Sequence, residues 1–188
     1  RCAFVVTRLL DKENTYTSSL WLYDGSVRQI TNLANKPGVR DGSPRWSPDG
    51  GSLAFLSNRS GKSQVWMLDL GGGEAYQVTD LPKGVSDFRF DPKGGALFLS
   101  AKEDKEEPKF REGATVRRIT KLRYKFNGAG YLDHLPVQVW KMDLETRKPQ
   151  MLTSGLYNCG TPKPSPDGRY VVFTSTRSDN EADMYSDL

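Results

Sequence analysis

Residues that support catalysis are scarce in this sequence. Its 188 residues include one histidine, His134, and two cysteines, Cys2 and Cys159. A lone histidine without a partnered nucleophile is far more often a surface residue than a general base. Two cysteines are fewer than a disulfide framework uses, which favours two reduced thiols. No Cys/His cluster or Asp-rich loop has metal-ligand spacing, so we expect no metal and no other cofactor.

Two catalytic motifs are also missing. Gly61-Lys62-Ser63 and Gly84-Val85-Ser86 lack the closing glycine of a Gly-x-Ser-x-Gly nucleophile elbow. The first of these tripeptides resembles the end of a phosphate-binding loop, but Leu56 stands where the first glycine belongs. We therefore predict no catalytic residues in this chain and no catalytic activity of the chain on its own.

Long hydrophobic runs are absent as well. No segment approaches the roughly 20 apolar residues that a membrane-spanning helix needs, and no basic and apolar leader precedes the first strand-like run. With 36% hydrophobic and 27% charged residues, the composition is that of an ordinary globular chain. These features predict a cytoplasmic protein without a membrane partner.

The most informative stretch runs from Ser43 to Thr79. It contains four short apolar or alternating runs separated by turn residues: PRWS, SLAFLS, QVWMLD and AYQVT. The first turn, Ser47-Pro48-Asp49-Gly50, has the residues of a type I turn, and Gly71-Gly72-Gly73 accommodates positive φ angles. This pattern predicts a four-stranded antiparallel meander, which is the outline of one propeller blade.

Parts of this unit recur along the chain. The Pro-Asp-Gly turn at Pro48 returns at Pro92 as Pro-Lys-Gly and at Pro166 as Pro-Asp-Gly. The third-strand pattern Trp-x-x-Asp occurs three times, and each copy is followed by a short run that ends in threonine: Trp21 and Thr31, Trp66 and Thr79, Trp140 and Thr153. A period of about 40 to 45 residues with four strands per repeat is typical of β-propellers. We therefore predict an all-β fold built from propeller blades.

The blade boundaries follow from these repeats. We expect blades at residues 1–31, 43–79, 85–153 and 161–188, about three and a half blades in total. In the first blade we expect strands at Cys2 to Thr7, Leu20 to Asp24 and Val27 to Thr31, with a polar loop from Leu9 to Ser19. Because the repeat starts and stops within a blade, we expect a fragment of a longer propeller. Its terminal blades would expose apolar faces and strand edges, which predicts self-association or a partner that supplies further blades.

The third repeat is interrupted by a long insertion. Residues 102–136 stand where the second blade has only the six residues 58–63. Within it, basic and apolar residues alternate from Lys121 to Phe126, and the hairpin signal Asn127-Gly128 follows. We therefore predict a β-hairpin that projects from the blade. Its candidate contacts with substrate or an interface are Lys121, Arg123, Tyr124 and Lys125.

The insertion also carries a basic run, and the chain has a net charge of +4. Basic runs and a positive net charge are typical of nucleic-acid-binding proteins. Five basic residues on one hairpin are more often a solvated face or a protein contact, and the overall excess of charge is small. We expect no nucleic-acid partner.

The repeats W-SPDG-x-x-L-A-F-x-S-x-R and V-W-x-x-D-L resemble the propeller repeats of the prolyl oligopeptidase family of serine peptidases and of the TolB proteins. The insertion from Arg118 to Leu132 resembles, more specifically, the R-Y-K/R-x-D/N-G-x-G-Y/F segment of acylaminoacyl peptidases, also called acyl-peptide hydrolases. That family combines a propeller of seven or eight blades with a C-terminal α/β-hydrolase domain that carries Ser, Asp and His. None of these three catalytic positions lies in this chain.

The resemblance implies a non-catalytic role within a peptidase that removes acylated amino acids or short peptides from peptide N-termini. The propeller would act as a size filter over the active site, and its partners would be the hydrolase domain and short peptides. The alternative is a stand-alone TolB-like propeller that binds a protein partner. A carbohydrate-processing propeller enzyme would need paired carboxylates on its inner strands, and the stretch from Ser43 to Ser47 offers none.

Overall fold

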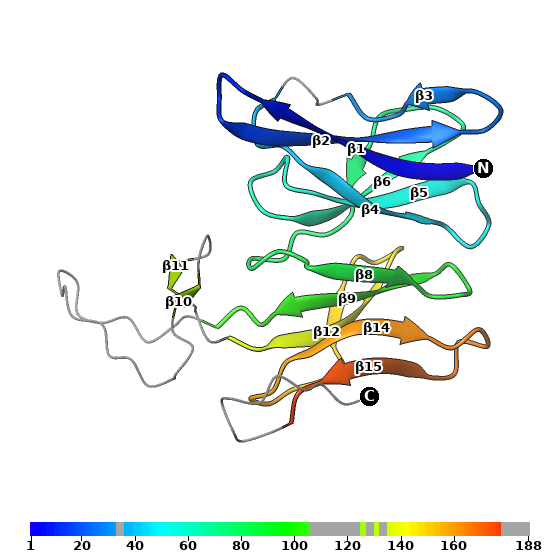
Figure 1. Ribbon diagram of the computed structural model, residues 1–188. Helices are drawn as coiled ribbons and strands as arrows, with labels where there is room; N and C mark the ends of the chain where they lie inside the picture. The colour runs from blue at the N-terminus through cyan, green and yellow to red at the C-terminus, as the bar shows by residue number, and fades with distance from the viewer. Residues whose placement is uncertain (33–35, 106–124, 127–129, 132–134, 178–188) are drawn as a thin grey trace.

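The computed structural model describes residues 1–32, 36–105, 125–126, 130–131 and 135–177, where all regular structure is β-strand. Four antiparallel sheets follow one another along the chain and are stacked face to face (Figure 1). A fifth, two-stranded sheet projects from the third. The predicted all-β propeller architecture is confirmed.

The first sheet has the order β1-β2-β3. Its strands are β1 (Cys2–Leu10), β2 (Thr15–Tyr23) and β3 (Val27–Gln29). The predicted polar loop from Leu9 to Ser19 is wrong, because Leu9 pairs directly with Tyr16 and only residues 11–14 form the turn. The β-branched and aromatic residues Thr15 to Thr17 favour strand. Asn14, at φ 46°, closes the turn in the left-handed region that asparagine tolerates.

The second sheet has the order β4-β5-β6-β7 and contains the four predicted runs. Its strands are β4 (Asp41–Trp46), β5 (Ser52–Ser57), β6 (Gln64–Asp69) and β7 (Tyr76–Gln77). The first strand begins at Asp41, two residues before the predicted start at Ser43. A bulge between Gly42 and Arg45 interrupts its pairing with β5.

The third sheet has the order β13-β12-β9-β8 and carries the insertion between its two central strands. Its strands are β8 (Asp87–Phe90), β9 (Ala96–Lys102), β12 (Val137–Asp143) and β13 (Pro149–Met151). Lys102 pairs directly with Val137, so the ladder continues across the ends of the insertion. Within the insertion, β10 (Lys125–Phe126) and β11 (Gly130–Tyr131) form the predicted antiparallel pair.

The last sheet pairs β14 (Cys159–Pro164) with β15 (Val171–Ser175). A bulge between Gly160 and Lys163 repeats the bulge of β4. Residues 178–188 of the blade predicted at 161–188 lie outside the described residues. Cys159 is buried and Cys2 is exposed, and both are free thiols, as the sequence predicts.

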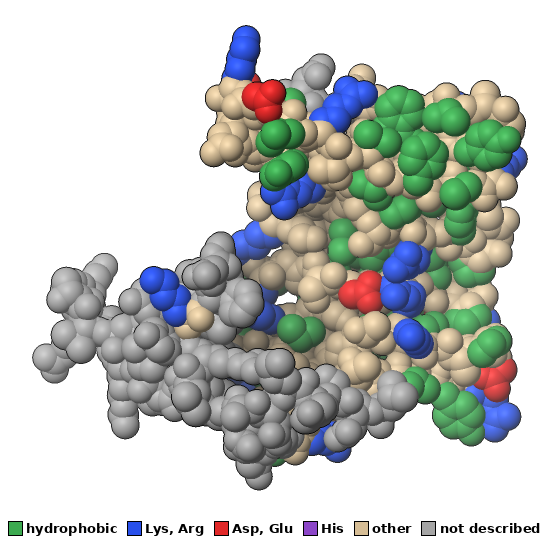
Figure 2. All heavy atoms as spheres, viewed as in Figure 1, with side chains coloured by type: hydrophobic (Ala, Val, Ile, Leu, Met, Phe, Trp, Pro, Cys, Tyr) green, Lys and Arg blue, Asp and Glu red, His purple; other side chains and the backbone are tan. Residues whose placement is uncertain are grey.

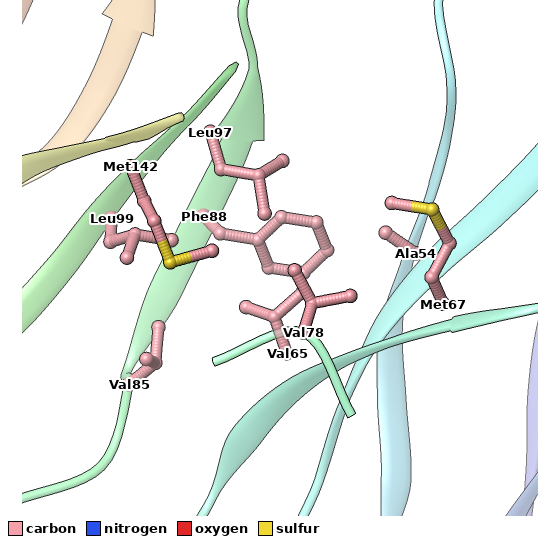
Figure 3. Close-up of a cluster of buried hydrophobic side chains, with 9 residues drawn as sticks. All are labelled: Ala54, Val65, Met67, Val78, Val85, Phe88, Leu97, Leu99 and Met142. Atoms are coloured by element: carbon pink, nitrogen blue, oxygen red, sulfur yellow. The ribbon is translucent and has the colours of Figure 1, made fainter. Parts of the chain in front are cut away.

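Two apolar clusters join the first three sheets. Alternate residues of β5 point to opposite sides: Leu53 and Phe55 pack with Leu20 of β2, whereas Ala54 packs with Phe88 of β8. The second cluster lies between the second and third sheets, and Phe88 is at its centre (Figure 3). Phe88 has no exposed surface, and burial of such a side chain contributes about 1.5 to 3 kcal/mol. The second sheet is therefore covered on both faces.

The recurrent threonines close each blade. The hydroxyl oxygens of Thr31, Thr79 and Thr153 accept hydrogen bonds of 2.8 to 2.9 Å from backbone N–H groups of the neighbouring strands β2, β6 and β12. In the second and third sheets the same hydroxyl donates to a buried glutamine, Gln64 or Gln138. Each threonine thus fixes the chain where the short fourth strand ends.

The recurrent Ser-Pro-Asp-Gly turns are built identically. The Ser47 hydroxyl donates to Asp49 Oδ1 over 2.5 Å, and the Gly51 N–H donates to the same oxygen over 3.0 Å. Ser165 and Asp167 repeat this arrangement. The hydrogen bonds from Ser47 and Ser165 are the main reason that the pKa values of Asp49 and Asp167 lie below 3.8. Hydrogen bonds from Thr146 lower the pKa of Asp143 in the same direction.

A buried ion pair lies at the junction of the first two sheets. The Arg59 guanidinium donates to both carboxylate oxygens of Asp41 at 2.7 and 2.8 Å, and Asp41 has no exposed side-chain surface. The guanidinium carbon also lies 4.7 Å from the ring centroid of Trp66. The Ser18 hydroxyl donates to the backbone oxygen of Asp41 and so links β2 to β4. The ion pair therefore joins β4 to the segment that follows β5, and the Ser18 hydrogen bond joins β4 to β2.

The turn carboxylates predict how stability depends on pH. A lowered pKa in the folded state contributes stability above the unfolded-state pKa, and this contribution is lost as the pH falls through the folded-state pKa. We expect the variant D49N/D143N/D167N to lose less stability than the wild type between about pH 5 and pH 2. Urea denaturation at several pH values measures this. Equal slopes for the two proteins would contradict it.

The ion pair predicts a large effect of one substitution. Arg59→Leu should lower the free energy of unfolding by about 3 to 5 kcal/mol, because it leaves the buried Asp41 carboxylate without its partner. The control Arg8→Leu removes an exposed arginine and should change stability by about 0.5 kcal/mol or less. The double variant D41L/R59L should recover part of the loss. If Arg59→Leu costs no more than Arg8→Leu, the pair does not hold β4 in place.

Candidate functional site: the first strands of the blades

The predicted contact residues of the hairpin are only partly described. Lys125 lies at the start of β10, where it is exposed and pairs with Tyr131. Lys121, Arg123 and Tyr124 lie outside the described residues, as does His134. The role predicted for this basic hairpin therefore stays a prediction.

A second group of basic residues comes from the first strands of three consecutive sheets. β4, β8 and β14 each form an edge of their own sheet, and β8 contacts both β4 and β14. In a propeller the edges that converge in this way line the central axis. The same edge of the stack is turned toward the viewer in Figures 1 and 2.

Each of these strands carries one basic residue at the same position. Arg45 pairs with Ala54, Arg89 with Phe98 and Lys163 with Val172. The three partners occupy equivalent places, since each lies four residues after the glycine that closes its turn. Directly opposed residues of an antiparallel pair share a face, so the three basic residues repeat from blade to blade. We call Arg45, Arg89 and Lys163 the basic stripe.

The basic stripe is accessible. Lys163 is exposed and Arg45 is half-buried, while the side chain of Arg89 keeps 24% of its surface. Figure 2 shows Lys and Arg side chains gathered beside an acidic one at the level of β8 and β14. The three side chains of the stripe therefore keep solvent-accessible surface with which to contact a ligand.

The bulges of β4 and β14 lie directly before two residues of the stripe. Ser43 and Thr161 adopt φ angles of 51° and 52°, an uncommon conformation for residues other than glycine. Each is followed by a proline and then by the basic residue, in the matching segments Gly-Ser-Pro-Arg and Gly-Thr-Pro-Lys. Bulges re-aim side chains and are frequent beside functional sites. The repeated strain therefore marks the strand positions that present Arg45 and Lys163.

Acidic residues on these strands neutralise little of the stripe. Asp87 pairs with Arg89 over 2.6 Å. Asp41 is buried against Arg59, and the uncharged Cys159 occupies the equivalent position of β14, as its pairing with Ser175 shows. Within the described parts of the chain, neither Arg45 nor Lys163 has a carboxylate partner. The stripe thus carries an excess of positive charge.

Other chemistry has no support among the described residues. They contain no group of three or more His, Cys, Asp or Glu residues placed to bind a metal ion. A search of the same residues also found no helix of the length and apolar character required to span a membrane. The arrangement suits the binding of anionic groups by charge.

Comparison with known proteins points to propellers of two kinds. No family model matches the chain. Over 96% of its length, the chain is 29% identical to the uncharacterized peptidase YuxL of Bacillus subtilis and spans 28% of that protein. The acylaminoacyl peptidase of Pyrococcus horikoshii superposes with a TM-score of 0.61 at 20% identity, covering 97% of this chain and 30% of the peptidase.

A putative TolB from Agrobacterium tumefaciens has nearly the same geometry, with a TM-score of 0.58 and 17% identity over 95% of this chain and 52% of that protein. At identities this low, the superpositions establish the fold alone. With the sheets, their order and these superpositions together, the chain is part of a β-propeller of the type found in acylaminoacyl peptidases and TolB proteins.

Proposed function

We propose that this chain is part of the propeller of a serine peptidase related to acylaminoacyl peptidases. The observation that carries the proposal is the match to a peptidase over 96% of the chain, a span that extends beyond the insertion at both ends. The hairpin pair β10-β11 lies where the acylaminoacyl peptidase resemblance is most specific. The TolB likeness supports the alternative, a stand-alone protein-binding module.

In this proposal the propeller excludes large substrates by size. A filter of this kind must not widen when a large polypeptide presses against it. The stacked sheets suit this task, because their faces are joined by close-packed apolar clusters that resist deformation. The size limit would then be set by geometry, without bond chemistry in the propeller itself.

The full-length protein that contains this chain tests the proposal. It should hydrolyse short N-acylated peptides and leave the same sequence within a folded protein uncleaved. The sequence encoded beyond Leu188 should contain a Gly-x-Ser-x-Gly elbow, followed by Asp and His. A propeller that closes without such a domain, together with no peptidase activity, would favour the TolB-like alternative.

The hairpin is proposed to contact substrate, the hydrolase domain or a second subunit. The variant R123A/Y124A in the full-length protein should change the ratio of kcat/KM between short and long peptides about fivefold, or change the assembly state, since a lost contact of about 1 kcal/mol corresponds to that factor. The control K12A/K148A removes two exposed charges elsewhere and should change neither. If both readouts stay constant while the fold is retained, the hairpin has no such role.

We also propose that the isolated chain associates with a second copy of itself. Large apolar side chains are exposed on the first sheet, where Leu9 faces Tyr16 and Tyr23 faces Val27 across neighbouring strands. In contrast, β5, β6, β8, β9 and β12 expose no such side chain. Covering these pairs would remove apolar surface from water.

Light scattering at micromolar concentration should therefore give a mass above that of one chain. The variant Y23S/V27S should shift the population toward the monomer, because it removes one exposed apolar pair without touching the core. A wild-type chain that is monomeric throughout this range would contradict the proposal.

A further inference from the structure

The basic stripe carries a function that the size filter does not require. Arg45, Arg89 and Lys163 come from parts of the chain 44 and 74 residues apart, yet the strand pairing places them at one position in three successive blades. Stability alone does not explain them, since among the described residues the guanidinium of Arg45 donates only to the neighbouring backbone oxygen of Pro44.

The spacing of the stripe limits what can bridge it. Packed sheets lie about 10 Å apart, so neighbouring positive charges are separated by about one sheet spacing. A single small anion such as phosphate reaches one blade at a time. A ligand that uses the whole stripe must carry several anionic groups about 10 Å apart.

An extended peptide meets this requirement. In the polyproline II conformation a chain has three residues per turn and rises about 3.1 Å per residue, so every third side chain lies on one face, about 9 Å from the next. Such a backbone has no internal hydrogen bonds, so its carbonyl groups stay free to accept hydrogen bonds from the protein. A nucleic acid carries phosphates at a closer spacing and depends on a larger basic surface.

We propose that the basic stripe binds acidic peptide segments in an extended conformation, with carboxylates at every third residue paired to Arg45, Arg89 and Lys163. The inference adds a ligand class to the proposed propeller role but does not depend on peptidase activity, since a TolB-like binding module could use the same stripe. Asp87 already pairs with the guanidinium of Arg89. Arg45 and Lys163 have no carboxylate partner among the described residues, so we expect them to contribute more to the binding of an acidic ligand.

Fluorescence anisotropy with the chain itself tests the inference. The probe is fluorescein-labelled Glu-Pro-Pro-Glu-Pro-Pro-Glu, compared with the same peptide carrying lysine for glutamate and with Pro-Pro-Glu-Glu-Glu-Pro-Pro. We expect saturable binding of the first peptide, no binding of the lysine peptide and weaker binding of the peptide with adjacent glutamates. Raising the salt from about 20 to 200 mM should weaken binding, because the charges lie at an accessible edge.

The double variant R45Q/K163Q should weaken binding of the acidic peptide roughly five- to tenfold, as expected for two accessible ion pairs. Arg89 is left in place because its removal would leave Asp87 unpaired. The control K12Q/K148Q removes the same number of charges away from the stripe and should retain wild-type affinity. Circular dichroism of both variants verifies that the fold is intact.

The inference is overturned if the acidic and lysine peptides bind equally, if no peptide binds, or if both double variants lose the same affinity. Tighter binding of single-stranded oligo-dT than of the acidic peptide would make the stripe a nucleic-acid site instead. Failure of the peptidase assay on the full-length protein affects none of these outcomes, so the two proposals are tested separately.

Discussion

The structure depends on apolar packing between the faces of neighbouring sheets. The second sheet shows this directly, because Phe55 packs toward the first sheet and Ala54, the adjacent residue, packs toward the third. A strand that is apolar on both sides is stable only within such a stack. This packing positions the sheets. The hydrogen bonds of the closing threonines and the Asp41–Arg59 ion pair then hold individual strands in place.

Much of this fold follows from the sequence because the repeats specify local structure. The recurrent turns at Pro48, Pro92 and Pro166 each connect the first and second strands of a sheet. The first sheet is harder to predict from the sequence, because its turn of residues 11–14 lacks glycine and proline. The polar residues before Ser19 therefore predict a loop. In the structure, their β-propensity and their pairing with β1 place them in β2.

The candidate site was less accessible to sequence reasoning. The segments Gly-Ser-Pro-Arg and Gly-Thr-Pro-Lys are visible in the sequence. The equivalent segment that ends at Arg89 lacks the glycine and the proline. Only the pairing with Ala54, Phe98 and Val172 shows that the three basic residues are equivalent. The threonines illustrate the same limit: the sequence shows that they recur, but only the structure shows their hydrogen bonds to the neighbouring strands, such as β2 and β12.

The continuous ladder between β9 and β12 has a consequence for how such chains diversify. Lys102 and Val137 pair as closely as Ser57 and Gln64 do, although 34 residues, 103–136, separate the first pair and six, 58–63, separate the second. Loop-closure entropy grows only with the logarithm of length, so the longer connection costs about 1.5 kcal/mol more. The tip of a blade is therefore a place where evolution, or an engineer, can graft a new segment at little thermodynamic cost to the host sheet.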